Sequence, residues 1–290
     1  MKNQIEIIIE SREKDIGVKV GRVLPFAKRR MVGPFIFLDE MGPALLKAPT
    51  DKIDVRPHPH IGLSTLTYLF EGEMLHHDSL GSKQLIVPGE VNWMTAGSGI
   101  SHSERETEEA KKQNRSIHGL QFWVALPKEY EDVEPSFHHY ERDDIPEFKT
   151  ESLTIKLVAG SSQGKQSKLK AYSPMTFMVM HAHKEGDFSH HENGHEHALY
   201  VVKGSLTING ETYTAKKMIV FKDDAAIEVQ HSNDAVFALI GGKAFPEPRF
   251  IWWNLVSSDQ TKIELAKKQW KERTFPQVPG EDDFIPLPEN

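Results

Sequence analysis

The chain has 290 residues, a formal net charge of −7 and no cysteine. A chain of this length can bury the core of one large domain or of two ordinary ones, and we expect two. The negative charge disfavours binding to nucleic acid or to anionic membrane surfaces. The lack of cysteine excludes disulfides, thiolate metal ligands and a cysteine nucleophile.

The first residues, MKNQIEIIIESREKD, contain a short apolar run that Glu6 interrupts. They lack the longer apolar region and the small-residue cleavage site of a signal peptide. No stretch reaches the roughly 20 apolar residues that a membrane-spanning helix requires. We therefore expect a cytoplasmic protein with no membrane and no direct nucleic-acid partner.

Short segments rich in Val, Ile, Thr, Phe and Tyr recur along most of the chain, separated by glycine-containing turns. This spacing favours an all-β sandwich or barrel over strands that alternate with helices. Asn209-Gly210, between SLTI and ETYT, predicts a tight hairpin. The sequence YLFEG at 68–72 is echoed by YVVKG at 200–204, which suggests two copies of one β fold.

One helix is predicted near the C-terminus. It begins near SSDQ, where Ser257 and Gln260 have the spacing of a capping box, and it carries Ile263, Ala266 and Trp270 on one face. The charged run RETEEAKKQNR at 105–115 is expected to be a solvated loop or a short surface helix.

A charged, proline-containing stretch separates the two strand-rich halves. It has too few apolar residues to form core, so we interpret it as a connection between domains. The predicted organisation is an N-terminal metal-binding domain at 1–130, a linker at 131–147, and a C-terminal domain with the helix and tail at 148–290.

Two short histidine motifs predict a metal site in the N-terminal half. His58 and His60 begin the segment HPHIGLSTLTYLFEG, and His102 and Glu104 follow a glycine-rich turn in TAGSGISHSE. Residues two apart on a strand share a face, so an antiparallel return can bring all four side chains together. Three imidazoles and one carboxylate suit Fe, Mn, Co, Ni, Cu or Zn. An isolated HPH is more often a surface turn, but the turns, the tryptophan and the His-x-Glu pair that follow favour the metal site.

The remaining histidines are interpreted separately. His76, His77 and His118 are expected in hydrogen-bonded structural or surface positions, with a contact to a metal ligand as the alternative. A dense C-terminal cluster is interpreted as a solvated loop, because the return strand AAIEVQHSN lacks a His-x-Glu pair. A second ion there is the alternative left open. The cluster consists of His181, His183, His190, His191, His195 and His197.

HPHIGLSTLTYLFEGEMLHHDSLG followed by VPGEVNWMTAGSGISHSE resembles the pirin family of bicupins, as do AKRRMVGPFIFLDEMGP and IHGLQFWVALP. The resemblance implies two antiparallel, jelly-roll β-barrels with a short C-terminal helix. It also implies one Fe ion (Fe2+ or Fe3+) per chain, held by His58, His60, His102 and Glu104, with other divalent transition metals as alternatives. Ile61 and Ser64 stand where many pirins have Arg and Glu, which alters the charge near the metal and bears on substrate preference.

Some pirins resemble flavonol-cleaving dioxygenases. This implies an oxidoreductase of the quercetin 2,3-dioxygenase type, which uses O2 to open a flavonol-like aromatic substrate and releases carbon monoxide. Glu104 would be the catalytic residue, either completing the metal coordination or accepting the proton of the substrate hydroxyl. The alternative is a metal- or redox-dependent regulatory protein, a transcription cofactor or enzyme modulator, that binds a protein partner without turnover. A third hypothesis is a metal storage or stress protein.

Overall fold

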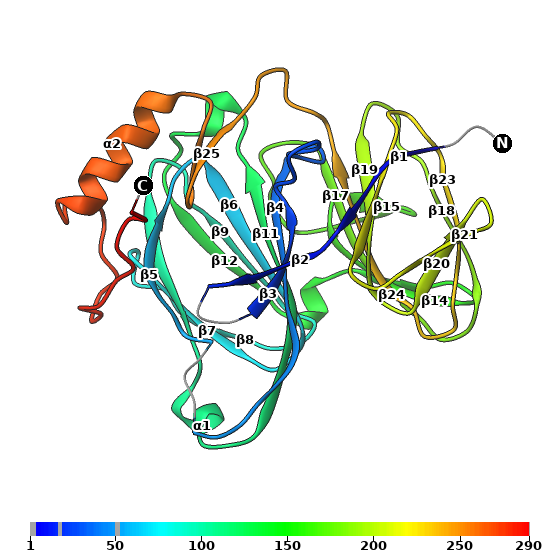
Figure 1. The fold of residues 1–290 in the computed structure, drawn as a ribbon, viewed down its shortest axis with the longest axis horizontal. Coiled ribbons are helices and arrows are strands. Elements are labelled where there is room, and N and C mark those ends of the chain that lie inside the picture. Colours follow the sequence, from blue (N-terminus) through cyan, green and yellow to red (C-terminus); the bar gives the residue numbers. More distant parts are fainter. Residues whose placement is uncertain (1–3, 17–18, 50–52, 290) are drawn as a thin grey trace. The chain divides into compact units, whose positions relative to one another are not determined.

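The computed structural model describes residues 4–16, 19–49 and 53–289, and strands dominate these ranges (Figure 1). The strands group into two units. The first unit comprises Lys14–Val20, Asp39–Arg142 and Pro246–Asn290, and the second comprises Met1–Glu13, Gly21–Leu38 and Asp143–Phe245. The all-β prediction is confirmed.

Two antiparallel sheets have strands that belong mostly to the first unit, and the smaller of the two carries the predicted metal ligands. The larger has the order β12 (Ser136–Tyr140), β9 (Val91–Thr95), β6 (Leu63–Glu71), β11 (Arg115–Ala125), β4 (Phe35–Leu46), β3 (Lys19–Leu24) and β2 (Arg12–Asp15). The smaller has the order β5 (Val55–His60), β10 (Ile100–Arg105), β7 (Met74–Asp78) and β8 (Lys83–Ile86). Strands β25 (Phe250–Trp252) and β26 (Leu255–Ser257) of the first unit pair with each other in a separate short hairpin.

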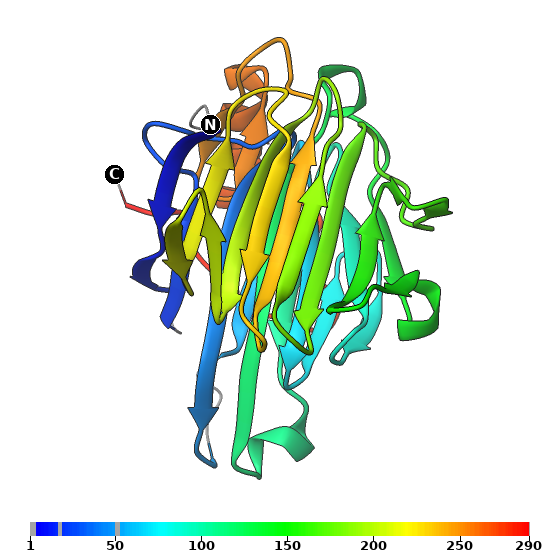
Figure 2. The same ribbon diagram turned by 90° about the vertical axis from the view of Figure 1, so that its right-hand side faces the viewer.

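The second unit repeats this arrangement, and Figure 2 shows its strands lying side by side. Its larger sheet has the order β1 (Ile5–Glu10), β22 (Lys217–Phe221), β19 (Glu196–Lys203), β24 (Val236–Gly242), β17 (Met175–Ala182), β14 (Leu153–Ala159) and β13 (Glu147–Lys149). Its smaller sheet has the order β18 (Gly186–His190), β23 (Ile227–His231), β20 (Ser205–Ile208) and β21 (Glu211–Thr214). A two-stranded ribbon pairs β15 (Ser161–Ser162) with β16 (Lys165–Gln166).

The matching strand orders confirm two copies of one β fold. In the second unit, Phe188 and Val229 of the smaller sheet share one buried apolar cluster with Leu199 and Leu239 of the larger sheet. The core therefore lies between the two sheets. Along β23 buried and exposed residues alternate, as a strand with one face on a core requires.

The predicted hairpin at Asn209-Gly210 is also confirmed. Ile208 pairs with Glu211, which leaves a two-residue turn between β20 and β21. Asn209 and Gly210 have φ values of 51° and 83°. Positive φ at both central residues is the geometry for which Asn-Gly is favoured.

The unit boundaries differ from the predicted domain boundaries. The C-terminal segment from 246 groups with the first unit, because β26 contacts β5 and β6 and Trp270 packs in one cluster with Ile61. Within the predicted linker, β12 pairs with β9. At the other end of the chain, β1 pairs with β22 of the second unit. These pairings join segments that are far apart in sequence, so no local pattern marks them.

The predicted C-terminal helix is α2 (Gln260–Lys271). Its N-cap is Asp259, whose side chain accepts a hydrogen bond from the backbone N–H of Thr261 at 2.8 Å. Ser257, which we expected to cap the helix, instead donates its hydroxyl to Glu131 at 2.8 Å. The helix therefore begins where the SSDQ motif predicts, but a different residue caps it.

The apolar face of α2 is also as predicted, since Ile263, Ala266 and Trp270 are buried. Replacing Ile263 by valine removes one methylene from this cluster and should lower the free energy of unfolding by about 1 kcal/mol. Leu265→Val is the matched control, because Leu265 is 57% exposed on the same helix. Urea denaturation measures both, and equal losses would contradict the packing role of Ile263.

The charged run at 105–115 contains the short helix α1 (Glu108–Lys111), none of whose residues is buried. The described chain also contains 3-10 turns at Lys128–Tyr130 and Arg142–Asp144. Within the described ranges, no helix combines the length and the apolar character that crossing a membrane would require.

Candidate metal centre

Strand β5 places His58 and His60 on one face of the smaller sheet of the first unit. Pro57 and Pro59 alternate with them and cannot donate a backbone hydrogen bond. A central strand would not tolerate two such residues, but β5 is the edge strand of its sheet and pairs only with β10. The HPH motif is therefore compatible with this edge position.

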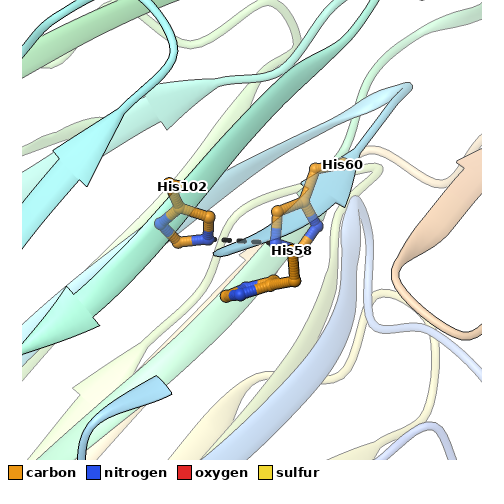
Figure 3. A group of neighbouring side chains, drawn as sticks. All are labelled: His58, His60 and His102. Atoms are coloured by element: carbon orange, nitrogen blue, oxygen red, sulfur yellow. Dashed lines mark hydrogen bonds between the residues drawn. The ribbon is translucent and has the colours of Figure 1, made fainter. Parts of the chain in front are cut away.

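Strand β10 brings His102 directly opposite His58. Ring centroids are 4.4 Å apart for His58 and His102, and 5.0 Å apart for His60 and each of the other two. One ring nitrogen of each histidine lies within 4.8 Å of those of the other two. The three rings, all buried, point toward one another in Figure 3. The structure thus brings together three of the four predicted ligands.

The outward-facing nitrogens of two histidines are already engaged. Nδ1 of His58 donates to the backbone carbonyl of Arg56 at 2.9 Å. Nδ1 of His60 donates to the carbonyl of Asn254 at 3.0 Å. Each ring therefore presents the lone pair of Nε2 to the centre of the cluster. Metal-binding histidines in proteins are usually held by such bonds at the other nitrogen.

His102 is supported by a longer chain of polar side chains. Its Nδ1 lies 3.3 Å from Nδ1 of His76, and Nε2 of His76 lies 3.0 Å from Oδ2 of Asp78. The other oxygen of Asp78 accepts the backbone N–H groups of Leu80 and Ser82. This chain fixes the ring plane of His102 and lets Nδ1–H of His102 donate to His76 when Nε2 binds a cation.

Burial keeps the three imidazoles neutral. Desolvation lowers the pKa of His58 to about 4 and holds those of His60 and His102 well below the ordinary value. For Asp78, burial acts to raise the pKa, but hydrogen bonds from His76 and Ser82 outweigh it and lower the pKa. At neutral pH the cluster therefore offers three neutral imidazoles, each with a nitrogen lone pair for a metal ion. The carboxylate of Asp78, which supports them through His76, is negatively charged.

Asp78→Asn should weaken metal binding by about 10–100-fold. Asparagine has one side-chain oxygen, which cannot accept a hydrogen bond from Nε2 of His76 and also from the two backbone N–H groups. A chelator-competition titration measures the change in affinity. Asp282→Asn removes the same charge from an exposed position of the same unit and serves as the control. Equal affinities for the two variants would rule out the supporting role of Asp78.

Glu104 lies two residues beyond His102 on β10, and the pairing with β5 shifts register between these two residues. Its carboxylate is not part of the group of donors that the structure places within 4.8 Å of one another in the described chain. Burial raises the pKa of Glu104 to about 7. Glu104 is thus a carboxyl group that gains or loses its proton near neutral pH, two residues from His102 along the same strand.

The structure also shows contacts that sequence reasoning missed. Trp123 meets the ring of His60 edge-on, with centroids 5.3 Å apart, and Phe137 stacks on His76 at 4.3 Å. His76 and Asp78 share a strand face at the same spacing as the HPH motif, and that spacing could have revealed them. The carbonyl of Asn254, 194 residues from its partner His60, leaves no signal in the sequence.

The other two N-terminal histidines have structural partners, as expected. Nε2 of His118 lies 3.0 Å from Glu40, and Nδ1 of His77 lies 2.9 Å from Glu281. Neither contributes a donor atom to the three-histidine group in the described structure. His76 instead makes the contact to a predicted metal ligand that was the alternative expectation, because its ring contacts the ring of His102 directly.

A duplicated antiparallel β fold with converging buried imidazoles in one copy defines a bicupin with a candidate metal centre. The chain belongs to the pirin family within that class. The Pirin family model matches residues 17–124, and the model of the Pirin C-terminal cupin domain matches residues 177–276. These matches confirm the family resemblance of the sequence motifs.

Relatives and solved structures agree with this assignment. The chain is 44% identical to a "Pirin-like protein" of Caulobacter vibrioides, over 98% of this chain and all of that protein. It is 38% identical to a "Putative quercetin 2,3-dioxygenase" of Pseudomonas aeruginosa, over 88% of this chain and 80% of that protein. The crystal structure of quercetin 2,3-dioxygenase from Acinetobacter baumannii superposes with a TM-score of 0.92 and 33% identity, covering 99% of this chain and 96% of that one.

Proposed function

We propose that this protein is an iron-dependent dioxygenase that opens the heterocyclic ring of flavonols such as quercetin and releases carbon monoxide. The observation that carries the proposal is the convergence of three neutral, buried imidazoles from β5 and β10. The names of the Pseudomonas and Acinetobacter proteins support the substrate class.

The donor set fits a first-row transition ion. Three imidazole nitrogens, with Glu104 as a fourth donor, suit Fe2+ or Fe3+ and also Mn, Co, Ni, Cu or Zn, and none of the donors is sulfur. Nδ1 of His58 and of His60 is bonded to a backbone carbonyl, so Nε2 is the atom left for the ion. One ion per chain is expected in the first unit.

An iron ion bound there would act as a Lewis acid that lowers the pKa of the flavonol 3-hydroxyl and makes the adjacent ring carbon electron-rich toward O2.

The chain's own residues would then hold the ion and manage one proton. His58, His60 and His102 supply neutral donors whose orientation is fixed by Arg56, Asn254 and His76. Glu104, with a pKa of about 7, would accept the proton of the 3-hydroxyl when it is not itself coordinated to the ion. A base whose pKa lies near the working pH is best suited to that transfer. Both atoms of O2 enter the ring-opened product, and the carbon that bears the 3-oxygen leaves with it as carbon monoxide, so no external reductant is required.

The proposal is tested by loading the purified chain with Fe(II) and mixing it with quercetin in air. We expect the flavonol absorbance to fall and carbon monoxide to be released in equal amount, and His60→Ala to abolish both. Tight iron binding without turnover of several flavonols would overturn the dioxygenase. In that case the metal-dependent regulatory protein, which binds a partner without turnover, would be the better account.

A further inference from the structure

The second unit contains another group of potential metal ligands. His190 ends β18, His197 lies in β19, and Glu192 lies in the loop that connects these strands. One donor atom of each lies within 4.8 Å of the other two. The two Nε2 atoms are 3.3 Å apart, and each is 4.0 Å from Oε2 of Glu192.

This group does not duplicate the first centre. In the first unit His60 pairs with Ile100 and His58 with His102, whereas in the second unit His190 pairs with Ile227 and Phe188 with Val229. His190 therefore occupies the place of His60, while apolar core residues replace His58 and His102. The partners of His190 come instead from the adjacent loop and from β19. A His-x-Glu pattern on the return strand therefore does not reveal these partners.

The fold holds these side chains in place. Oγ1 of Thr176 donates to Oε2 of Glu192 at 3.0 Å, and the backbone N–H of Gly194 donates to Asp224 at 2.8 Å, which anchors the loop. The ring of His197 lies so close to Gly241 that a Cβ atom there would be 2.4 Å from Cδ2 of the ring. Glycine at 241 thus leaves the room in which the His197 ring sits.

A further donor in this loop lacks a hydrogen bond. Nδ1 of His195 is buried and makes no hydrogen bond within the described structure, although it lies 3.2 Å from Oε2 of Glu192. A buried ring nitrogen without a hydrogen bond carries a desolvation cost, which binding of a cation beside Glu192 would offset. Burial also lowers the pKa of His197 to about 3 and lowers that of His190, so these rings are neutral near pH 7.

We propose that His190, Glu192 and His197 form a second site for a divalent first-row transition ion, with His195 as an additional donor. Two imidazoles and one carboxylate are a borderline donor set of the kind that binds Zn2+, Ni2+ or Fe2+. Glu192 is 37% exposed, so the ion is accessible to solvent and keeps positions for water. The site is independent of the first centre and of the proposed dioxygenase activity.

Calorimetric titration of the full chain with Zn2+ tests the proposal. The wild type should bind two ions and His60→Ala one ion. In the His60→Ala background, Glu192→Gln should weaken the remaining ion at least tenfold, and His190→Ala together with His197→Ala should abolish it. Glu192→Gln preserves the size of the side chain, so it separates loss of a ligand from loss of fold.

His191→Ala is the matched control, because His191 is an exposed histidine of the same loop. It should leave the affinity for the second ion unchanged. An equal loss in His191→Ala and Glu192→Gln would show adventitious binding to surface histidines and overturn the proposal. A His60→Ala chain that binds no Zn2+ would overturn it as well. Neither result depends on dioxygenase turnover.

Discussion

Replacing His60 by alanine should remove one transition-metal ion per chain and abolish flavonol turnover. Nε2 of His60 lies 3.1 Å from Nε2 of His102, and the ring touches both other histidines, so His60 is central to the cluster. In the described structure only two of the three converging donors, those of His58 and His102, then remain, and the carboxylate of Glu104 is not among the donors brought together there. Elemental analysis after gel filtration measures the loss of the ion.

His138→Ala is the control for this variant, because His138 is an exposed histidine on β12 of the same unit. It should keep the wild-type metal content and turnover. Circular dichroism should show that both variants retain the β structure. If His60→Ala kept its full complement of metal, the three-histidine centre would be refuted.

The affinity of the first centre should depend on pH through Glu104. The pKa of Glu104 is raised to about 7, whereas that of His58 is lowered to about 4. If Glu104 is a ligand, it must lose its proton to bind. Affinity should then be level above about pH 7 and fall about tenfold for each pH unit below it. The fall should become steeper near pH 4, where the imidazoles begin to protonate.

The variant Glu104→Gln separates the effect of the Glu104 proton on metal affinity from the effect of imidazole protonation. The amide has no proton to lose in this range, so the affinity of the variant should be weaker than that of the wild type at pH 7 and almost constant between about pH 5 and pH 7. Chelator-competition titration with Zn2+, in a background that carries both His190→Ala and His197→Ala, measures both proteins without a contribution from the second unit. Parallel pH curves for the two proteins would show that Glu104 does not bind the ion.

The sequence predicts the three-histidine cluster because its geometry is local. Alternation along a strand puts His58 and His60 on one face, and a glycine-rich turn before His102 allows the antiparallel return that pairs His102 with His58. The same regularity underlies the Asn209-Gly210 hairpin and the duplicated fold. Strand period and turn chemistry are short-range properties, so a single sequence reveals them.

Other features depend on contacts that no local pattern encodes. The register shift beside Glu104 arises from how β5 fits against β10, and the carbonyl that orients His60 comes from Asn254 in a distant segment. The pairing of β1 with β22 and the packing of Trp270 near Ile61 are equally remote in sequence. In the second unit, the spacing of residues on one strand face predicts that a partner of His190 would lie on β23. The structure instead brings His197 of β19, in the other sheet, next to His190.

Anomalous diffraction from crystals of the iron-loaded protein, collected at the iron edge, tests the central claim most directly. We predict a peak about 2.1 Å from Nε2 of each of His58, His60 and His102, with the Glu104 carboxylate beside it. Absence of a peak among these three rings in a protein that contains stoichiometric iron would contradict the proposed centre.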